Sequence, residues 1–238
     1  MLRRVARFIS GRLLPRRAYT ILRGPMKGSR FILGSLSGEG GGASVYLGKM
    51  EPEQTAAMAE AIRPGGVFFD IGANVGYYTI LASRLVGSNG KVVAFEPAPR
   101  NIEFLRHHVE LNAAANVVLK TCAVSNAKGP VRFSLGPDSA MGHIGEEGEL
   151  EVETTTLDEV VSELGMTPNV MKIDVEGAEK EVFLGAARTL EKAKPAIFLS
   201  THSDELRTWC LEHLRGLGYT VKPLIGGEDG HEFIATHD

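Results

Sequence analysis

The sequence predicts an α/β fold in which helices cover both faces of a mostly parallel β-sheet. The first observation behind this prediction is that short apolar runs, typical of buried strands, alternate with segments of helical periodicity along most of the 238 residues. The second is a glycine-rich turn after the apolar run 67–70, which ends in Asp70 and meets Gly72 and Gly76 before the next helical segment. Open α/β sheets bind ligands at such strand ends, so this turn also predicts a ligand site.

The segments before the alternating part are short. Residues 30–33 and 45–47 are predicted to form strands on either side of the glycine-rich stretch 38–42. A helix is predicted from Pro52 to about Ile62, because proline suits the first turn of a helix and a Pro-Gly-Gly sequence follows.

From residue 67 onward, the apolar pattern gives the order of the elements. Strands are predicted at 67–70, 91–96 and 116–121, and helices at 77–86 and 99–112. Residues 131–134 and 150–154 alternate like strands with one side in water, and they enclose a glycine-rich polar loop at 136–148. The second half continues with helices at 157–164, 179–190 and 204–217, strands at 169–174 and 195–199, and an antiparallel pair at 219–221 and 232–235.

Two kinds of cofactor compete for the glycine-rich turn. A dinucleotide such as NAD needs Gly-x-Gly-x-x-Gly, whose second glycine lets the pyrophosphate approach the helix, and Asn74 occupies that position here. The order Asp-x-Gly-x-x-x-Gly suits S-adenosylmethionine (SAM), a cationic cofactor with an amino-acid tail. A second acidic residue is then expected at the next strand end to bind the ribose hydroxyls, and Glu96, followed by Pro97, supplies it. The pattern therefore favours SAM.

Three motifs resemble the FkbM-type methyltransferases: Asp-Ile-Gly-Ala-Asn-Val-Gly at 70–76, Phe-Glu-Pro at 95–97 and Met-Lys-Ile-Asp-Val-Glu-Gly-Ala-Glu at 171–179. The resemblance covers about residues 50–202. It implies a Rossmann-like, seven-stranded sheet with a reversed last strand, SAM as the cofactor, and O-methylation of a sugar, a glycan or a natural product. We expect a basic N-terminal arm with small strands at residues 1–49 and a methyltransferase domain at residues 50–238.

The expected cofactor contacts follow the ends of the strands. The amino-acid tail is expected along the turn 71–76 and the ribose at Glu96, with the adenine between Pro97 and the turn 121–125. The predicted cofactor-binding residues are Asp70, Ile71, Gly72, Ala73, Asn74, Gly76, Glu96, Pro97, Ala123, Val124 and Asp174.

Methylation of a hydroxyl requires a group that takes its proton. Asp174 ends a strand at the ligand-binding edge, and Glu176 lies in the turn that opens the next helix. His202 lies just beyond the strand 195–199 at the same edge, and a histidine pKa of about 6.5 suits proton removal. These three are the predicted catalytic residues, with His202 as the base. The family's usual pattern places an acidic residue two positions before this histidine, where this chain has Ser200.

No metal site is predicted. The two cysteines, Cys122 and Cys210, and the scattered histidines form neither a zinc pattern nor a disulfide framework. Magnesium at Asp174 is compatible with carboxylate chemistry, but the spacing does not require it. Lys172 shares a strand face with Asp174, and a buried lysine there needs a carboxylate partner.

Charge is distributed unevenly along the chain. Nine of the 26 basic residues and none of the 29 acidic residues lie in residues 1–38, so the rest of the chain is acidic. Apolar residues at helical spacing alternate with arginines from Leu2 to Leu13. Such a segment indicates peripheral membrane contact, a transit peptide, a helix that docks on the chain's own acidic body, or self-association with a second subunit. The acidic body disfavours nucleic acid as a partner. No apolar run is long enough to span a membrane, and the cysteine content indicates a cytoplasmic protein.

Other functional classes stay open beside an O-methyltransferase. An NAD-dependent oxidoreductase is disfavoured by Asn74 and by the lack of a Tyr-x-x-x-Lys pair. A non-catalytic SAM-binding scaffold that acts through its basic arm is disfavoured by Asp174 and His202. Nucleic-acid methylation would favour a basic body and an Asn-Pro-Pro-Tyr sequence, and the chain has neither.

Overall fold

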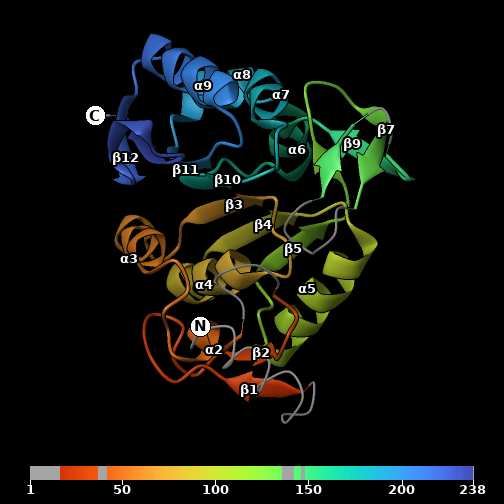
Figure 1. Ribbon diagram of the computed structural model, residues 1–238, viewed down its shortest axis with the longest axis vertical. Coiled ribbons are helices and arrows are strands. Elements are labelled where there is room, and N and C mark those ends of the chain that lie inside the picture. Colours follow the sequence, from red (N-terminus) through yellow and green to blue (C-terminus); the bar gives the residue numbers. More distant parts are fainter. Residues whose placement is uncertain (1–16, 37–41, 136–141, 146–147, 238) are drawn as a thin grey trace.

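A seven-stranded sheet forms the centre of the protein (Figure 1). The computed structural model describes residues 17–36, 42–135, 142–145 and 148–237. Neighbouring strands of the sheet run parallel, except that β13 (Glu232–Thr236) is antiparallel to both of its neighbours, as the predicted reversed last strand requires. In spatial order the strands are β12 (Thr220–Ile225), β13 (Glu232–Thr236), β11 (Ala196–Ser200), β10 (Val170–Ile173), β3 (Val67–Ile71), β4 (Lys91–Phe95) and β5 (Val117–Lys120).

Helices form a layer on each face of this sheet (Figure 1). Successive strand residues point to opposite faces, so Phe68 and Phe69 pack into two different apolar clusters, one under each helix layer. The first layer contains α3 (Pro52–Ala61), α4 (Tyr77–Val86) and α5 (Pro99–Leu111). The second contains α6 (Leu157–Leu164), α7 (Glu179–Leu184), α8 (Ala187–Ala193) and α9 (Asp204–Gly216). The predicted fold class is confirmed.

The prediction of one helix at 179–190 is wrong, because the structure divides this segment into α7 and α8. The division falls at Gly185, where a Cβ atom would lie 2.0 Å from the carbonyl oxygen of Ser125. A glycine is therefore needed for the segments around Gly185 and Ser125 to approach each other this closely. The new helix α8 is stabilised by Asp158, whose carboxylate accepts hydrogen bonds from the backbone nitrogens of Arg188 and Thr189.

A smaller, four-stranded sheet lies beside the carboxyl end of the main one. Its strands, in spatial order, are β6 (Ala123–Val124), β9 (Leu150–Thr155), β7 (Gly129–Ser134) and β8 (His143–Ile144). The predicted strands at 131–134 and 150–154 are confirmed as the antiparallel pair β7 and β9. Phe133 and Val152 form a small apolar cluster with Ala98, which follows β4, so this sheet packs against the carboxyl end of the main sheet.

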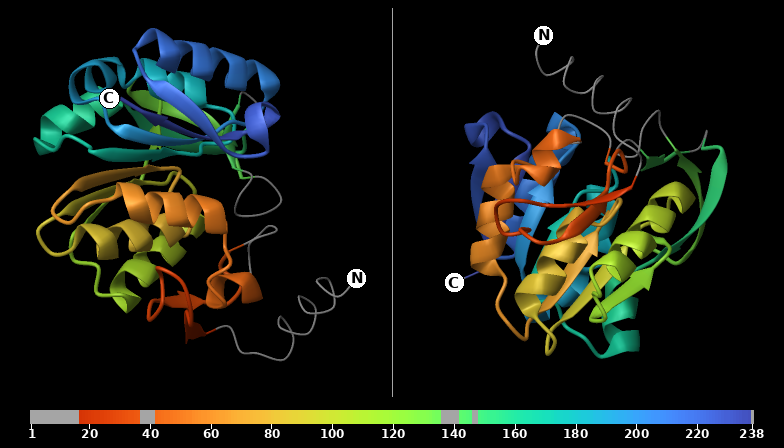
Figure 2. Two further views of the ribbon diagram at one scale, coloured as in Figure 1. Left: turned by 90° about the vertical axis from the view of Figure 1, so that its left-hand side faces the viewer. Right: turned by 90° about the horizontal axis from the view of Figure 1, so that it is seen from below.

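The described part of the N-terminal region packs into the main core (Figure 2). The strands β1 (Ala18–Thr20) and β2 (Arg30–Ile32) pair with each other, and Phe31 packs against His108 of α5 with ring centroids 4.2 Å apart. The predicted strand at 45–47 is wrong, because these residues belong to α2 (Ala43–Tyr46) and the turn after it. Three apolar residues are too few for periodicity to distinguish a strand from a helical turn.

The basic amphipathic segment, Leu2 to Leu13, lies outside the described residues. Among the helices that the structure describes, none combines the length and the apolar character needed to cross a bilayer. The boundary at residue 49, the roles considered for the arm and the cytoplasmic location therefore stay predictions.

Candidate active site

A cavity of about 480 Å³ opens at the carboxyl ends of the central strands. Residues from the ends of β3, β4, β10 and β11 line it, together with parts of the small sheet and of the segment before α3. Most of the residues predicted from the sequence lie on its wall: Ile71, Gly72, Ala73, Asn74, Glu96, Pro97, Ala123, Val124, Asp174 and Glu176. Asp70, Gly76 and His202 do not lie on that wall.

The turn after β3 has the left-handed backbone that its glycines predict. Gly72 has a φ of 81°, and a Cβ atom there would lie 1.8 Å from the carbonyl oxygen of Asp174. Asn74 also has a positive φ, of 51°, which asparagine tolerates better than most residues. Gly76 has a φ of 92° and faces Leu105 of α5, so its role is to position the start of α4. The turn therefore holds its backbone close against the end of β10.

Glu96 is buried at the end of β4 and organises the neighbouring loops. Its carboxylate accepts hydrogen bonds from the backbone nitrogen of Asn74, at 2.7 Å, and from that of Ala98, at 2.9 Å. The side-chain amide of Asn101 donates a third, at 3.3 Å. Burial raises the pKa of Glu96 to about 7, although these hydrogen bonds act in the opposite direction. The carboxylate keeps acceptor capacity toward the cavity that it lines.

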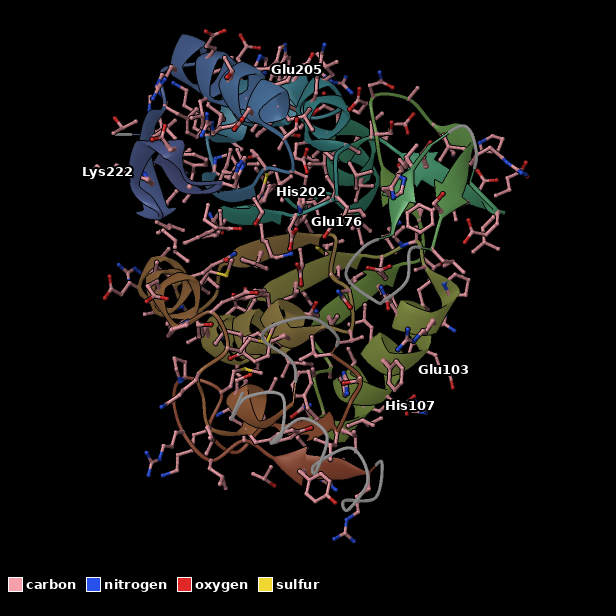
Figure 3. All side chains as sticks on the ribbon, viewed as in Figure 1. Glu103, His107, Glu176, His202, Glu205 and Lys222 are labelled. Atoms are coloured by element: carbon pink, nitrogen blue, oxygen red, sulfur yellow. The ribbon has the colours of Figure 1, made fainter. Side chains whose placement is uncertain are left out.

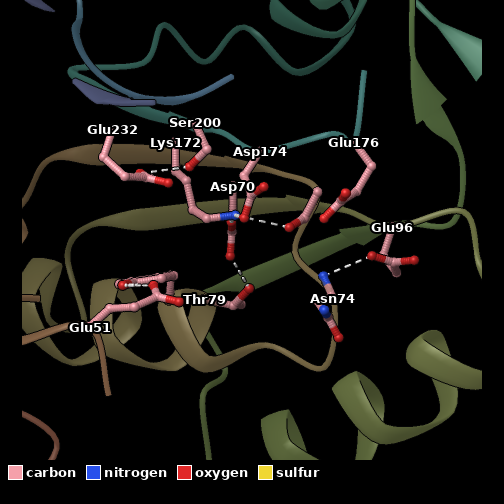
Figure 4. A network of polar contacts seen from close by, with 12 residues as sticks. Glu51, Asp70, Asn74, Thr79, Glu96, Lys172, Asp174, Glu176, Ser200 and Glu232 are labelled. Carbon is pink, nitrogen blue, oxygen red and sulfur yellow. Dashed lines mark hydrogen bonds and ion pairs between the residues drawn. The ribbon is translucent and has the colours of Figure 1, made fainter. Parts of the chain in front are cut away.

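Asp70 lies beneath the cavity and supports its floor. Lys172 is buried between two carboxylates, with Nζ 3.1 Å from Asp174 Oδ2 and 3.8 Å from Asp70 Oδ1 (Figure 4). Its Nζ also donates to the carbonyl oxygen of Gly72 at 3.0 Å, and Thr79 donates to Asp70 Oδ2. Burial acts to lower the pKa of Lys172, but the two carboxylates raise it above its usual range. The carboxylate partner expected for this lysine is confirmed, and Lys172 joins the ends of β3 and β10.

His202, which follows β11, meets Asp174 and Glu176, which follow β10. His202 Nε2 lies 3.5 Å from Asp174 Oδ1 and 3.4 Å from Glu176 Oε2. The other ring nitrogen, Nδ1, lies 2.6 Å from Glu179 Oε1, and Glu179 is completely buried at the start of α7. Figure 3 places His202 and Glu176 next to each other at the sheet edge, whereas His107 lies far away on α5.

The environment of His202 differs from that of a free base. Burial acts to lower its pKa, but hydrogen bonds to Glu176 and Glu179 and the charge of Asp174 raise the pKa to about 10. These contacts favour the protonated ring more than in a free histidine, and Asp174 and Glu176 are the groups beside it that line the cavity. This environment favours Asp174 or Glu176 over His202, the preferred base of the sequence analysis, as the group that accepts a proton.

The sequence analysis missed two acidic residues of the cavity. Glu232 of β13 lies opposite Ser200 of β11, and Ser200 Oγ donates to Glu232 Oε2 at 2.8 Å. Burial raises the pKa of Glu232 to about 7, against the hydrogen bond from Ser200. Glu51, just before α3, accepts a hydrogen bond from the hydroxyl of Tyr78. The sequence offered one signal, the serine at position 200 where the family has an acidic residue. In the structure the cross-strand neighbour, Glu232, brings a carboxylate to Ser200.

The sheet order, with one reversed strand, and the acidic residue at the second strand end define a Rossmann-like fold of the class I methyltransferase type. A methyltransferase FkbM from Methylobacillus flagellatus KT has a similar structure, with a TM-score of 0.55 and 17% sequence identity over 79% of this chain and 51% of that chain. A precorrin-6y C5,15-methyltransferase from Geobacter metallireducens has a TM-score of 0.52 and 20% identity over 80% of this chain and 89% of that one. These similarities establish the fold.

The sequence establishes the family: residues 70–221 match the methyltransferase FkbM domain, and the chain belongs to this family. It is 30% identical over 145 residues to the hexuronic acid methyltransferase AglP of Haloferax volcanii, a match over 59% of this chain and 58% of that protein. It is 28% identical over 214 residues to the 31-O-demethyl-FK506 methyltransferase FkbM of Streptomyces tacrolimicus, over 73% of this chain and 82% of the relative. The chain thus matches little more than half of AglP.

Proposed function

We propose that the protein is a SAM-dependent methyltransferase that methylates a hydroxyl group of a sugar, a glycan or another natural product. The observation that carries this proposal is the position of Glu96 and the β3 turn in the same cavity as Asp174 and Glu176. The names of the two relatives, one acting on a hexuronic acid and one on a demethylated FK506, support this class of acceptor.

The residues of the cavity fit SAM. Its volume of about 480 Å³ lies in the range of small-molecule cofactor sites. The buried carboxylate of Glu96 suits the two ribose hydroxyls as an acceptor, and the backbone of 72–74 suits the amino-acid tail. Pro97, Ala123 and Val124 offer an apolar surface for the adenine. When bound, SAM supplies an electrophilic methyl group, and S-adenosylhomocysteine (SAH) is left after transfer. Asp70 and Gly76 would act by shaping the site, since neither lines it.

Asp174 and Glu176, which line the cavity, are expected to place the acceptor hydroxyl, and His202 lies beside them. Bound SAM would supply the methyl group for the acceptor oxygen and would leave as SAH, so these side chains would have to orient the acceptor oxygen toward that methyl group. The hydroxyl proton passes to a carboxylate of Asp174 or Glu176, because a hydroxyl is a poor nucleophile without a proton acceptor. Glu179 fixes the ring of His202 through Nδ1, and Lys172 fixes Asp174 through Oδ2. Both are positioning residues.

The proposed activity can be tested with SAM that carries a labelled methyl group and a panel of neutral sugars, uronic acids and macrolides. Label is expected in at least one acceptor, and Asp174→Asn is expected to lower the rate at least 100-fold. Glu205→Gln, an exposed carboxylate on α9, is the matched control (Figure 3). Binding of SAM without transfer to any acceptor in the panel would instead favour the non-catalytic scaffold.

Cofactor affinity is expected to fall as the pH is lowered through the pKa of Glu96, about 7. The ionised carboxylate is the better acceptor for ribose hydroxyls, and only about a tenth of it remains ionised one pH unit below the pKa. The dissociation constant of SAH should therefore rise roughly tenfold between pH 8 and pH 6. Calorimetry at both pH values measures this change. Glu96→Gln cannot titrate, so an equal pH dependence in that variant would assign the effect to another group.

Glu232 is expected to bind the acceptor rather than the cofactor. Its carboxylate lines the cavity beside Ser200, in the place where the family's acidic residue is expected. A hydrogen bond to a charged group contributes about 1.5–3 kcal/mol, so Glu232→Gln should raise the KM for the acceptor roughly tenfold or more. The affinity for SAH should not change. Equal KM values for the variant and wild type would show that Glu232 has only a structural role.

A further inference from the structure

We propose that Asp174, Glu176 and His202 form a binding site for one divalent metal ion at the wall of the cavity. One potential ligand atom of each residue lies within 4.8 Å of the other two. His202 Nε2 lies 3.5 Å and 3.4 Å from the facing oxygens of Asp174 and Glu176. Two ligands at about 2.1 Å from one ion lie roughly 3.0–3.4 Å apart in octahedral or tetrahedral geometry. Small side-chain movements therefore suffice to bring all three atoms to the ion.

The ring of His202 is oriented as a metal ligand. A histidine that binds a metal through one ring nitrogen almost always donates the other N–H to a carboxylate or a carbonyl group. Here Nδ1 lies 2.6 Å from Glu179 Oε1, and this leaves Nε2 facing the two carboxylates. Glu179 is completely buried, and its Oε1 also accepts a hydrogen bond from the backbone nitrogen of Gly177. Its second oxygen has no hydrogen-bond partner among the described residues, so Glu179 acts through Oε1, which contacts both the ring of His202 and the backbone of Gly177.

The charges of the site also suit a divalent ion. Asp174 and Glu176 contribute two negative charges, and a neutral histidine contributes none. Lys172 already pairs with Asp174 Oδ2 and with Asp70, which leaves Asp174 Oδ1 on the side of His202. One nitrogen and two carboxylate oxygens form a donor set that accepts Mn²⁺ and neighbouring first-row ions. The sequence places these three residues at one edge of the sheet, but its spacing could not show that their ligand atoms lie this close, because Asp174 and His202 follow different strands.

The role of the ion in catalysis rests on the proposed function, whereas its binding does not. Asp174 and Glu176 line the cavity, so an ion between them is within reach of an acceptor oxygen. A divalent ion that binds a hydroxyl makes loss of the proton easier, which is the task assigned above to this cluster.

Binding can be measured with Mn²⁺, whose free aqueous form gives a strong electron paramagnetic resonance signal. We expect one Mn²⁺ per chain in the chelator-treated wild type. His202→Ala and Glu176→Gln should each weaken binding at least tenfold, and Glu179→Gln should weaken it roughly tenfold through the orientation of the ring. His107→Ala, which removes an exposed histidine from α5, should bind like the wild type.

Two results would overturn the metal site: no binding to the wild type at millimolar Mn²⁺, or equal affinity in wild type and in both ligand variants. Thermal unfolding of each variant verifies that it is folded. SAH titration of the same samples separates the two proposals. SAH binding without Mn²⁺ binding would reject the metal site alone, and Mn²⁺ binding without SAH binding would reject the proposed function alone.

Discussion

Replacing Glu96 by alanine is expected to weaken SAH binding roughly 100-fold or more. The carboxylate is the acidic group at the end of β4, and its bonds to the backbone of Asn74 and Ala98 hold both loops of the cavity. Each hydrogen bond to a charged acceptor contributes about 1.5–3 kcal/mol, and two ribose hydroxyls would each lose one in the variant. Titration calorimetry of the variant and the wild type measures the ratio of the dissociation constants.

Two further variants separate loss of contact from loss of folding. Glu96→Gln keeps the shape of the side chain and its acceptor oxygen, so we expect an affinity between those of the wild type and the alanine variant. Glu103→Gln, an exposed carboxylate on α5, should leave the affinity unchanged (Figure 3). If Glu96→Ala remains folded and binds SAH within a few-fold of the wild type, Glu96 does not bind the ribose.

Replacing Gly72 by alanine is expected to lower the free energy of unfolding by about 3–5 kcal/mol. The new Cβ atom would lie 1.8 Å from the carbonyl oxygen of Asp174, and the backbone atoms on both sides are fixed by the sheet. The φ of 81° adds a cost for any residue with a side chain. For a chain of this size the melting temperature should fall by roughly 6–20 °C, measured by circular dichroism.

A second glycine supplies the matched control for this variant. Gly165 ends α6 with a φ of 60°, and a Cβ atom there would meet nothing within 4 Å. Gly165→Ala therefore tests the cost of the left-handed backbone alone, about 1–2 kcal/mol. Equal melting temperatures for the two variants would show that the contact between Gly72 and Asp174 is not a constraint on the fold.

Local pattern was sufficient to predict most of the main sheet. The buried strands are continuous apolar runs, and the helices carry clear termination signals, so the bounds of α4 and α6 agree with the predicted ranges. The position of the cavity could also be predicted from the ends of these strands, because parallel strands bring their carboxyl ends to one edge of the sheet. The error at α2 arose where only three apolar residues were available, and the division of the helix at Gly185 arose from a contact with a distant segment.

The parts of the site that could not be predicted depend on pairings between distant residues. Glu232 reaches the cavity because β13 lies antiparallel to β11, and the register places it opposite Ser200. Glu179 at the start of α7 contacts the ring of His202 after β11, and the spacing of the sequence does not predict that these two segments meet. Asp70 was predicted to contact the cofactor because it ends the strand pattern, but its carboxylate lies below the wall and faces Thr79 and Lys172. Side-chain direction at a strand end is decided by packing.

The most direct test of the proposed cofactor is calorimetric titration of the wild-type protein with SAH and, in a separate experiment, with NAD. We predict one SAH per chain, bound with micromolar affinity, and no measurable binding of NAD. Failure to bind SAH, or tighter binding of NAD, would contradict the assignment of the cavity between β3 and β4 as a SAM site.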